Sequence, residues 1–229
     1  MRQVTLDTET TGLSTKNGDR IVEIGCVEII NRQITGKTFQ TYCNPEHPTN
    51  KDTFAITGIT DQFLSDKPKF ASIAENFLKF IDNAELIIHN AAFDVEFINN
   101  ELQLLNHEIK NISSKFKIVD TLVLARTMHP GQRNNLDALC KRYNINIERT
   151  LHGALLDAEI LAKLFLKMTA GQINLNFDLA EDIIENLNVI NRHGENMPTI
   201  EQNKKLKIIY ASLEELNLHE RYFSDLGKS

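Results

Sequence analysis

The alternation of strand and helix signals over the first 170 residues is the feature that most limits how this chain can fold. Three runs rich in β-branched and apolar residues come first, separated by turn sequences. They lie at 3–6, 20–30 and 33–43 and predict a meander of three strands. The patterns that follow predict a helix at 70–81, a strand at 85–88, a helix at 94–105, a strand at 116–119 and helices at 121–128, 135–143 and 154–168. This order predicts a single α/β domain over residues 1–170.

Composition agrees with one globular domain that carries an appendage. Of the 229 residues, 41% are hydrophobic and 24% are charged, as in soluble proteins. No apolar run approaches the roughly 18 residues that cross a bilayer, and the first residues do not resemble a signal peptide. We therefore expect no membrane segment and a cytoplasmic location. The cysteines are widely spaced among apolar residues, which predicts buried thiols at Cys26, Cys43 and Cys140.

Four carboxylates lie near the ends of predicted elements. Asp7 and Glu9 follow the apolar run 4–6, and side chains two residues apart on a strand share one side. Like charges held that close need a cation. Asp94 lies near a helix start, and Asp157 lies in the first turns of the helix that follows His152. Taken singly, Asp94 and Asp157 are better explained by helix capping, but together the four acids suit a two-cation site for phosphoryl transfer.

The order and wording of these segments resemble the DEDDh 3′-to-5′ exonucleases. The three motifs of that family correspond to LDTETTG at 6–12, HNAAFDVEF at 89–97 and HGALLDAE at 152–159. Other segments, including PGQRNNLDALCKRY at 130–143, also resemble the family, so the resemblance covers essentially residues 1–170. The resemblance implies a ribonuclease H-like fold. In that fold a mixed sheet with three leading antiparallel strands is flanked by helices on both faces.

The same resemblance implies the chemistry of the site. It makes Asp7, Glu9, Asp94 and Asp157 the ligands of two divalent cations, Mg²⁺ or Mn²⁺, and oxygen ligands suit both ions. It makes His152 the group that takes a proton from the attacking water. His89 is a supporting hydrogen-bond donor or only a residue at a strand end.

The expected substrate is the frayed, single-stranded 3′ end of DNA, which stacking and phosphate contacts would hold. The substrate contacts that the resemblance implies are Asp7, Glu9, Thr10, Asp52, Thr57, Phe93 and Asp157. One departure is Thr57, because some relatives place a histidine there near the bound nucleotide. We therefore expect the affinity or the pH dependence of this chain to differ from theirs.

The sequence changes character after residue 168 and predicts a tail with two docking elements. QINLNF at 172–177 fits the Gln-x-x-Leu-x-Phe peptide that binds the bacterial sliding clamp, with Gln172, Leu175 and Phe177 as anchors. The remainder, 178–229, resembles a linker and a helical segment that docks on the catalytic (alpha) subunit of a replicative polymerase. Composition alone leaves a second reading open, in which this segment is a helical hairpin packed on its own domain.

The formal net charge of −6 argues at first against a nucleic-acid partner. Carboxylates that hold cations weaken this argument, and a tether supplies effective concentration in place of intrinsic affinity. We therefore expect a proofreading DNA exonuclease. One alternative is an RNA-trimming enzyme of the same family, which would not need the tail elements. Another is a non-catalytic subunit that bridges polymerase and clamp, which would not need the complete set of catalytic residues.

Overall fold

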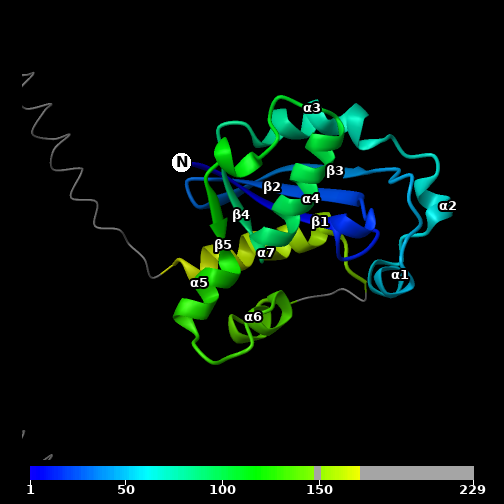
Figure 1. Ribbon diagram of the computed structural model, residues 1–229. Helices are drawn as coiled ribbons and strands as arrows, with labels where there is room; N and C mark the ends of the chain where they lie inside the picture. Colours follow the sequence, from blue (N-terminus) through cyan, green and yellow to red (C-terminus); the bar gives the residue numbers. More distant parts are fainter. Residues whose placement is uncertain (147–150, 171–229) are drawn as a thin grey trace, which may run out of the picture. The chain divides into compact units, whose positions relative to one another are not determined.

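The computed structural model describes residues 1–146 and 151–170 and has a five-stranded mixed sheet at its centre (Figure 1). The strands are β1 (Arg2–Thr10), β2 (Ile21–Ile30), β3 (Gln33–Tyr42), β4 (Glu85–Ile88) and β5 (Ile118–Asp120). Their order is β3-β2-β1-β4-β5. The first three pair antiparallel, whereas β4 runs parallel to β1 and β5 parallel to β4. The predicted mixed sheet is confirmed.

The two turns of the meander use left-handed backbone conformations, which tight turns require. Asn31 and Arg32 both have positive φ, 49° and 65°, as a two-residue hairpin turn requires. Gly18, with φ of 85°, ends a short 3₁₀ turn at Thr15–Asn17 before β2 begins. These turns bring β1, β2 and β3 together as neighbours.

Helices cover both faces of the sheet. Those in the described residues are α1 (Lys51–Thr57), α2 (Asp61–Leu64), α3 (Phe70–Ile81), α4 (Ala91–Leu104), α5 (Thr121–Met128), α6 (Leu136–Arg142) and α7 (Ala154–Met168). On one face, α3 and α4 bury Phe77 and Phe97 against Val4 and Leu6. On the opposite face lies α7, against which α5 and α6 also pack (Figure 1).

The helix α7 lies close to the sheet because small residues line its inner side. Ala158 and Ala162, one turn apart, are fully buried with Val27, Ile29 and Ile87 of the sheet. The hydroxyl of Thr5 on β1 donates to the carbonyl of Ala158 at 2.8 Å. The first strand and the last helix of the domain are therefore tied directly.

Most predicted elements are present, with differences at their ends. The helices 70–81, 121–128 and 154–168 and the strand 85–88 have the predicted bounds. The first strand continues through the acidic pair to Thr10, α4 begins three residues earlier than expected, and β5 lies at 118–120. Helices α1 and α2 were not predicted, because seven and four residues are too few to show helical periodicity.

The three cysteines are buried, as predicted. Within the described residues no helix is both long and apolar enough to span a membrane. The chain divides into two units, 1–173 and 174–229. The second unit lies outside the described residues, and so do the expected clamp peptide and polymerase-docking segment.

Candidate active site

The acidic pair lies on β1, at the centre of the sheet. Asp7 and Glu9 are partly exposed, whereas Thr8 and Thr10 between and after them are buried. This alternation places both carboxylates on one side of the strand, as the sequence predicted, and the contact of Thr5 with Ala158 shows that this side faces α7. Because both residues pair with β2, opposite Gly25 and Glu23, the backbone gives the two acids a fixed spacing.

Asp94 reaches the same end of the sheet from α4. The strand β4 ends opposite Leu6, so the backbone of Thr8 lies just beyond the β1–β4 ladder. The N–H and the hydroxyl of Thr8 both donate to Oδ1 of Asp94, at 2.9 and 2.8 Å. Thr8 thus fixes Asp94 beside the strand residues Asp7 and Glu9.

Burial makes Asp94 costly to ionise. Its residue is only 3% exposed, and loss of hydration raises the pKa of the carboxyl to about 7, against the lowering effect of the two bonds from Thr8. A nearby cation would favour the ionised form. Asp94 therefore has the properties of a metal ligand whose carboxyl group loses its proton when the metal binds.

His152 and Asp157 form the third part of the site, at the start of α7. Nδ1 of His152 lies 2.9 Å from Oδ2 of Asp157. The aspartate is 4% exposed, whereas the histidine side chain is 42% exposed. A buried carboxylate thus orients an imidazole that remains open to solvent and substrate.

Glu9, His152 and Asp157 converge on one point. One ligand atom from each lies within 4.8 Å of the others, which is close enough to surround a single ion. Glu9 and Asp157 supply the oxygen donors that Mg²⁺ and Mn²⁺ prefer, and Asp7 lies on the same face of β1. The residues present therefore fit a divalent metal centre.

A glycine allows α7 to approach this end of the sheet. Gly25 on β2 is the register partner of Asp7. A Cβ at this position would lie 2.2 Å from the backbone carbon of Ala154 and 2.2 Å from the nitrogen of Leu155. No other residue type fits there without moving the helix that carries Asp157.

The residues expected to touch substrate lie in different environments. Asp52 is exposed in the first turn of α1, and Phe93 is half-buried against Phe97. Thr10 and Thr57 are buried. The hydroxyl of Thr57 donates to the carbonyl of Thr53 at 3.1 Å and accepts from the N–H of Ile59 at 3.2 Å, so its hydrogen bonds are local.

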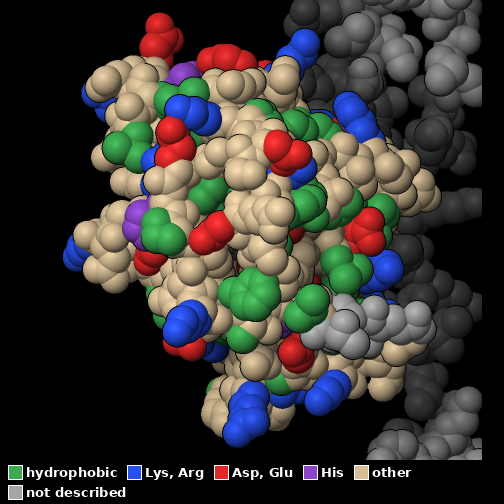
Figure 2. Space-filling view, turned by 90° about the vertical axis from the view of Figure 1, so that its right-hand side faces the viewer, with side chains coloured by type: hydrophobic (Ala, Val, Ile, Leu, Met, Phe, Trp, Pro, Cys, Tyr) green, Lys and Arg blue, Asp and Glu red, His purple; other side chains and the backbone are tan. Residues whose placement is uncertain are grey.

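Helix α1 nevertheless lies beside the site. The backbone N–H of His152 donates to the carbonyl of Ile56 at 3.0 Å. Ile56 and Phe54 are exposed apolar side chains on this helix. Figure 2 shows the face of the molecule on which α1 and α2 lie, where hydrophobic and acidic side chains gather near the middle and Lys and Arg lie largely toward the edges.

His89 directly follows the last residue of β4 and contacts the start of α5. Its Nδ1 lies 2.9 Å from the hydroxyl of Thr121 at the start of α5. Burial lowers the pKa of His89, which favours the neutral ring. This agrees with the view of His89 as a residue at a strand end.

Two residues important for the geometry were not foreseen, Thr8 and Asp120. Asp120 accepts from the N–H groups of Asn90 and Ala91, both at 3.1 Å, and so holds the start of α4. The signal that could have revealed it is an aspartate between a predicted strand and a predicted helix.

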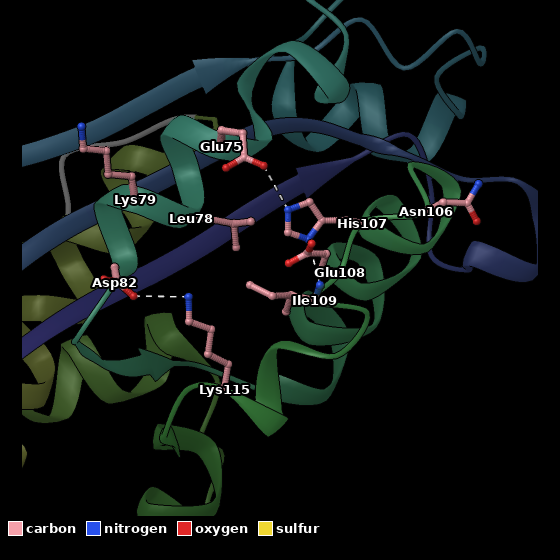
Figure 3. A pocket seen from close by; sticks show the side chains of 9 residues that line it. All are labelled: Glu75, Leu78, Lys79, Asp82, Asn106, His107, Glu108, Ile109 and Lys115. Atoms are coloured by element: carbon pink, nitrogen blue, oxygen red, sulfur yellow. Dashed lines mark hydrogen bonds and ion pairs between the residues drawn. The ribbon is translucent and has the colours of Figure 1, made fainter.

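A cavity of about 660 Å³ lies elsewhere, beside α3 and the segment that follows α4 (Figure 3). Its walls are joined by two pairs, Glu75 with His107 at 3.0 Å and Asp82 with Lys115 at 3.3 Å. None of the four site carboxylates lines it. Four of its charged side chains therefore already have partners within the cavity.

Comparison with known proteins agrees with this geometry. The family model described as Exonuclease, RNase_T, matches residues 4–165. The nuclease domain of 3′hExo, a DEDDh family member bound to rAMP, has the same fold. Its TM-score is 0.66 at 16% identity, over 76% of this chain and 94% of that one. Exonuclease X in complex with 5′-overhanging duplex DNA aligns with a TM-score of 0.58 at 27% identity, over 74% and 92% of the two chains.

The sequence relatives are more similar still. DNA polymerase III subunit epsilon of Salmonella typhimurium is 45% identical over 226 residues, which cover 96% of this chain and 90% of the relative. The protein of the same name from Buchnera aphidicola is 49% identical over 233 residues, which cover 98% and 97% of the two chains. The chain therefore belongs to the DEDDh exonuclease family and, within it, to the group of bacterial DNA polymerase III epsilon subunits.

Proposed function

We propose that this chain is the proofreading 3′-to-5′ exonuclease of a bacterial replicative DNA polymerase and hydrolyses the terminal phosphodiester to release 5′-mononucleotides. The observation that carries the proposal is the convergence of Glu9, His152 and Asp157, with Asp7 and Asp94 at the same end of the sheet. Relatives named DNA polymerase III subunit epsilon, similar over nearly the whole chain, support the polymerase context.

The metal ligands in this proposal are Asp7, Glu9, Asp94 and Asp157. Two divalent cations, Mg²⁺ or Mn²⁺, would activate water and stabilise the leaving oxygen. Asp7 and Glu9 present their carboxylates from the part of β1 that is paired with β2. Asp94 and Asp157 add buried carboxylates, and nearby cations would stabilise their ionised forms.

His152 acts as the general base. Its Nδ1 faces Oδ2 of Asp157, so in the neutral ring Nδ1–H donates to the carboxylate and Nε2 can accept a proton. Asp157 then stabilises the imidazolium that forms. The exposure of His152 lets its ring reach the water that attacks the phosphodiester.

Substrate recognition uses α1 and the end of β1. The exposed apolar side chains of α1 offer surfaces on which terminal bases can stack, without reading sequence. Asp52, Phe93 and Thr10 are further substrate contacts in this proposal. Thr57 contributes through the backbone it holds, because both of its hydrogen bonds are local.

The tail supplies the partners. Gln172, Leu175 and Phe177 would bind the sliding clamp, and the segment 178–229 would dock on the catalytic (alpha) subunit of the polymerase. Tethering would raise the local concentration of the nuclease at the primer end. The complex would act in the bacterial cytoplasm.

The test uses the full chain with 3′-labelled single-stranded DNA and, in parallel, RNA of the same sequence. We expect release of 5′-monophosphates from DNA that depends on Mg²⁺ or Mn²⁺ and is lost in His152→Ala. His107→Ala, a histidine change in the separate cavity, should leave the rate unchanged. Preference for RNA would favour a trimming enzyme, and no cleavage of either substrate would favour a bridging subunit.

A further inference from the structure

Glu23 is a buried acid of β2 that the mechanism above does not use. It is 1% exposed and is the register partner of Glu9 on β1, so the two side chains lie on the same face of the sheet, under α7. Gln40 of β3 donates to its Oε1 at 2.7 Å. The other oxygen, Oε2, accepts from the backbone N–H of Ala154 at 3.1 Å.

This contact replaces a cap that α7 lacks. The N-cap residue of α7 is Gly153, which has no side chain to accept from the first N–H groups of the helix. Helices α1, α2, α5 and α6 are instead capped by their own N-cap side chains. Like α7, α4 lacks its own side-chain cap and is held by a carboxylate from the sheet, that of Asp120. The two helices that carry Asp94 and Asp157 are therefore both anchored by acids of β-strands.

The anchored turn contains the reactive part of the site. Ala154 is two residues after His152 and three before Asp157. On the other side, the N–H of His152 donates to the carbonyl of Ile56. The backbone that presents His152 is thus held from α1 at one point and from β2 at the other.

We propose that Glu23 is a positioning residue for the exonuclease reaction, which sets the place of His152 and Asp157 by capping α7 from β2. Glu23 touches neither substrate nor the reacting atoms in this assignment. Its oxygen serves as a hydrogen-bond acceptor, so a neutral glutamine can take its place. Gln40 can rotate its amide to present its oxygen to the new donor.

The test compares Glu23→Ala and Glu23→Gln in the full chain. For Glu23→Ala we expect kcat on single-stranded DNA to fall about 10- to 100-fold, as for other groups that orient metal ligands, with KM changed less than about threefold. The Mg²⁺ or Mn²⁺ concentration that gives half of the maximal thermal stabilisation should rise about 10-fold or more. Glu23→Gln should keep kcat within about threefold of the parent, because the acceptor remains.

Glu28→Ala is the matched control. Glu28 is also a buried glutamate of β2, but it pairs with Arg2, away from α7. Its removal should lower stability without changing kcat or the metal dependence. If Glu23→Ala does not fold, Glu23→Asp provides the same test, because the shorter side chain keeps the charge but draws the oxygen away from Ala154.

Three outcomes would overturn the inference. One is that Glu23→Ala, or Glu23→Asp in its place, behaves like Glu28→Ala in kcat and metal dependence. Another is that Glu23→Gln is as inactive as Glu23→Ala, since the charge and not the acceptor would then be required. The third is a change confined to KM. The inference rests on the proposed function, and an inactive parent chain would defeat that function, whereas the metal-dependent thermal shift would still test the role of Glu23.

Discussion

Asp94 provides a quantitative test of the site, because it is a carboxylate held almost entirely out of water. Burial raises its pKa to about 7, whereas an aspartate in an unfolded chain titrates near about 3.9. Because the folded pKa is the higher one, the contribution of Asp94 to stability is fully present below about pH 4. It is lost as the pH rises through about 7. In the metal-free protein, ionised Asp94 should therefore destabilise the fold at pH 8.

The size of this effect follows from the two pKa values. A difference of about three units, at about 1.4 kcal/mol per unit, gives an upper limit of about 4 kcal/mol at pH 8. Water that reaches the carboxylate reduces this, so we expect about 2 kcal/mol. Asp94→Asn keeps an oxygen for Thr8 and has no charge to bury. It should raise Tm in EDTA at pH 8 by about 4 to 8 °C for a domain of this size.

The assay is thermal unfolding of the full chain in EDTA at pH 5 and pH 8, repeated with Mg²⁺. At pH 5 the gain should be about a third of that at pH 8, and with Mg²⁺ the parent should recover the difference. Asp137→Asn is the control, because Asp137 is also in the first turn of a helix, α6, but is exposed. An equal gain at both pH values, or a loss of stability at pH 8, would refute the reasoning.

Three further changes test the supports of the site. Thr8→Val removes one of the two hydrogen bonds to Asp94 and should cost about 1 kcal/mol in urea unfolding with Mg²⁺ present; an unchanged midpoint would contradict this. Gly25→Ala should cost about 1 to 3 kcal/mol by the same measurement, because the new methyl group meets the backbone of α7, and a neutral result would mean that the helix moves freely. Asp120→Ala should cost about 2 kcal/mol, since it uncaps both α4 and α5, and Asp120→Asn should restore part of that loss.

The elements that the sequence predicted well are those with a long hydrophobic pattern or with a pattern that lies within one short segment. The helix at 70–81 has apolar residues at helical spacing, and six of its twelve residues are buried. The metal-ligand candidates on β1 also follow from local alternation, because Asp7 and Glu9 need only an extended backbone to face one side. The end of that strand was missed, since threonines and acids after an apolar run look like a loop.

The supports of the site could not be predicted, because they join residues far apart in the sequence. Thr8 and Asp94 are separated by 86 positions, and Glu23 and Ala154 by 131. Neither Thr8 nor Glu23 stands out locally, because a threonine or a glutamate on a strand has many ordinary explanations. Gly25 becomes informative only when the backbone of α7 is known to lie over it.

The hydrogen bond between the N–H of His152 and the carbonyl of Ile56 means that the parts of the site should differ in their resistance to local unfolding. Asp7 and Glu9 belong to a nine-residue strand that pairs with β2 along this stretch and with β4 up to Leu6, so its amide protons should exchange with solvent more slowly than those of a short helix. The backbone N–H of His152 is held by α1, a seven-residue helix that can open at lower free energy, while Glu23 of β2 holds the turn that follows through Ala154. In rising denaturant the backbone at His152 should therefore lose its contact with α1 while Asp7 and Glu9 stay in place on β1. The enzyme would then lose its activity before the domain unfolds.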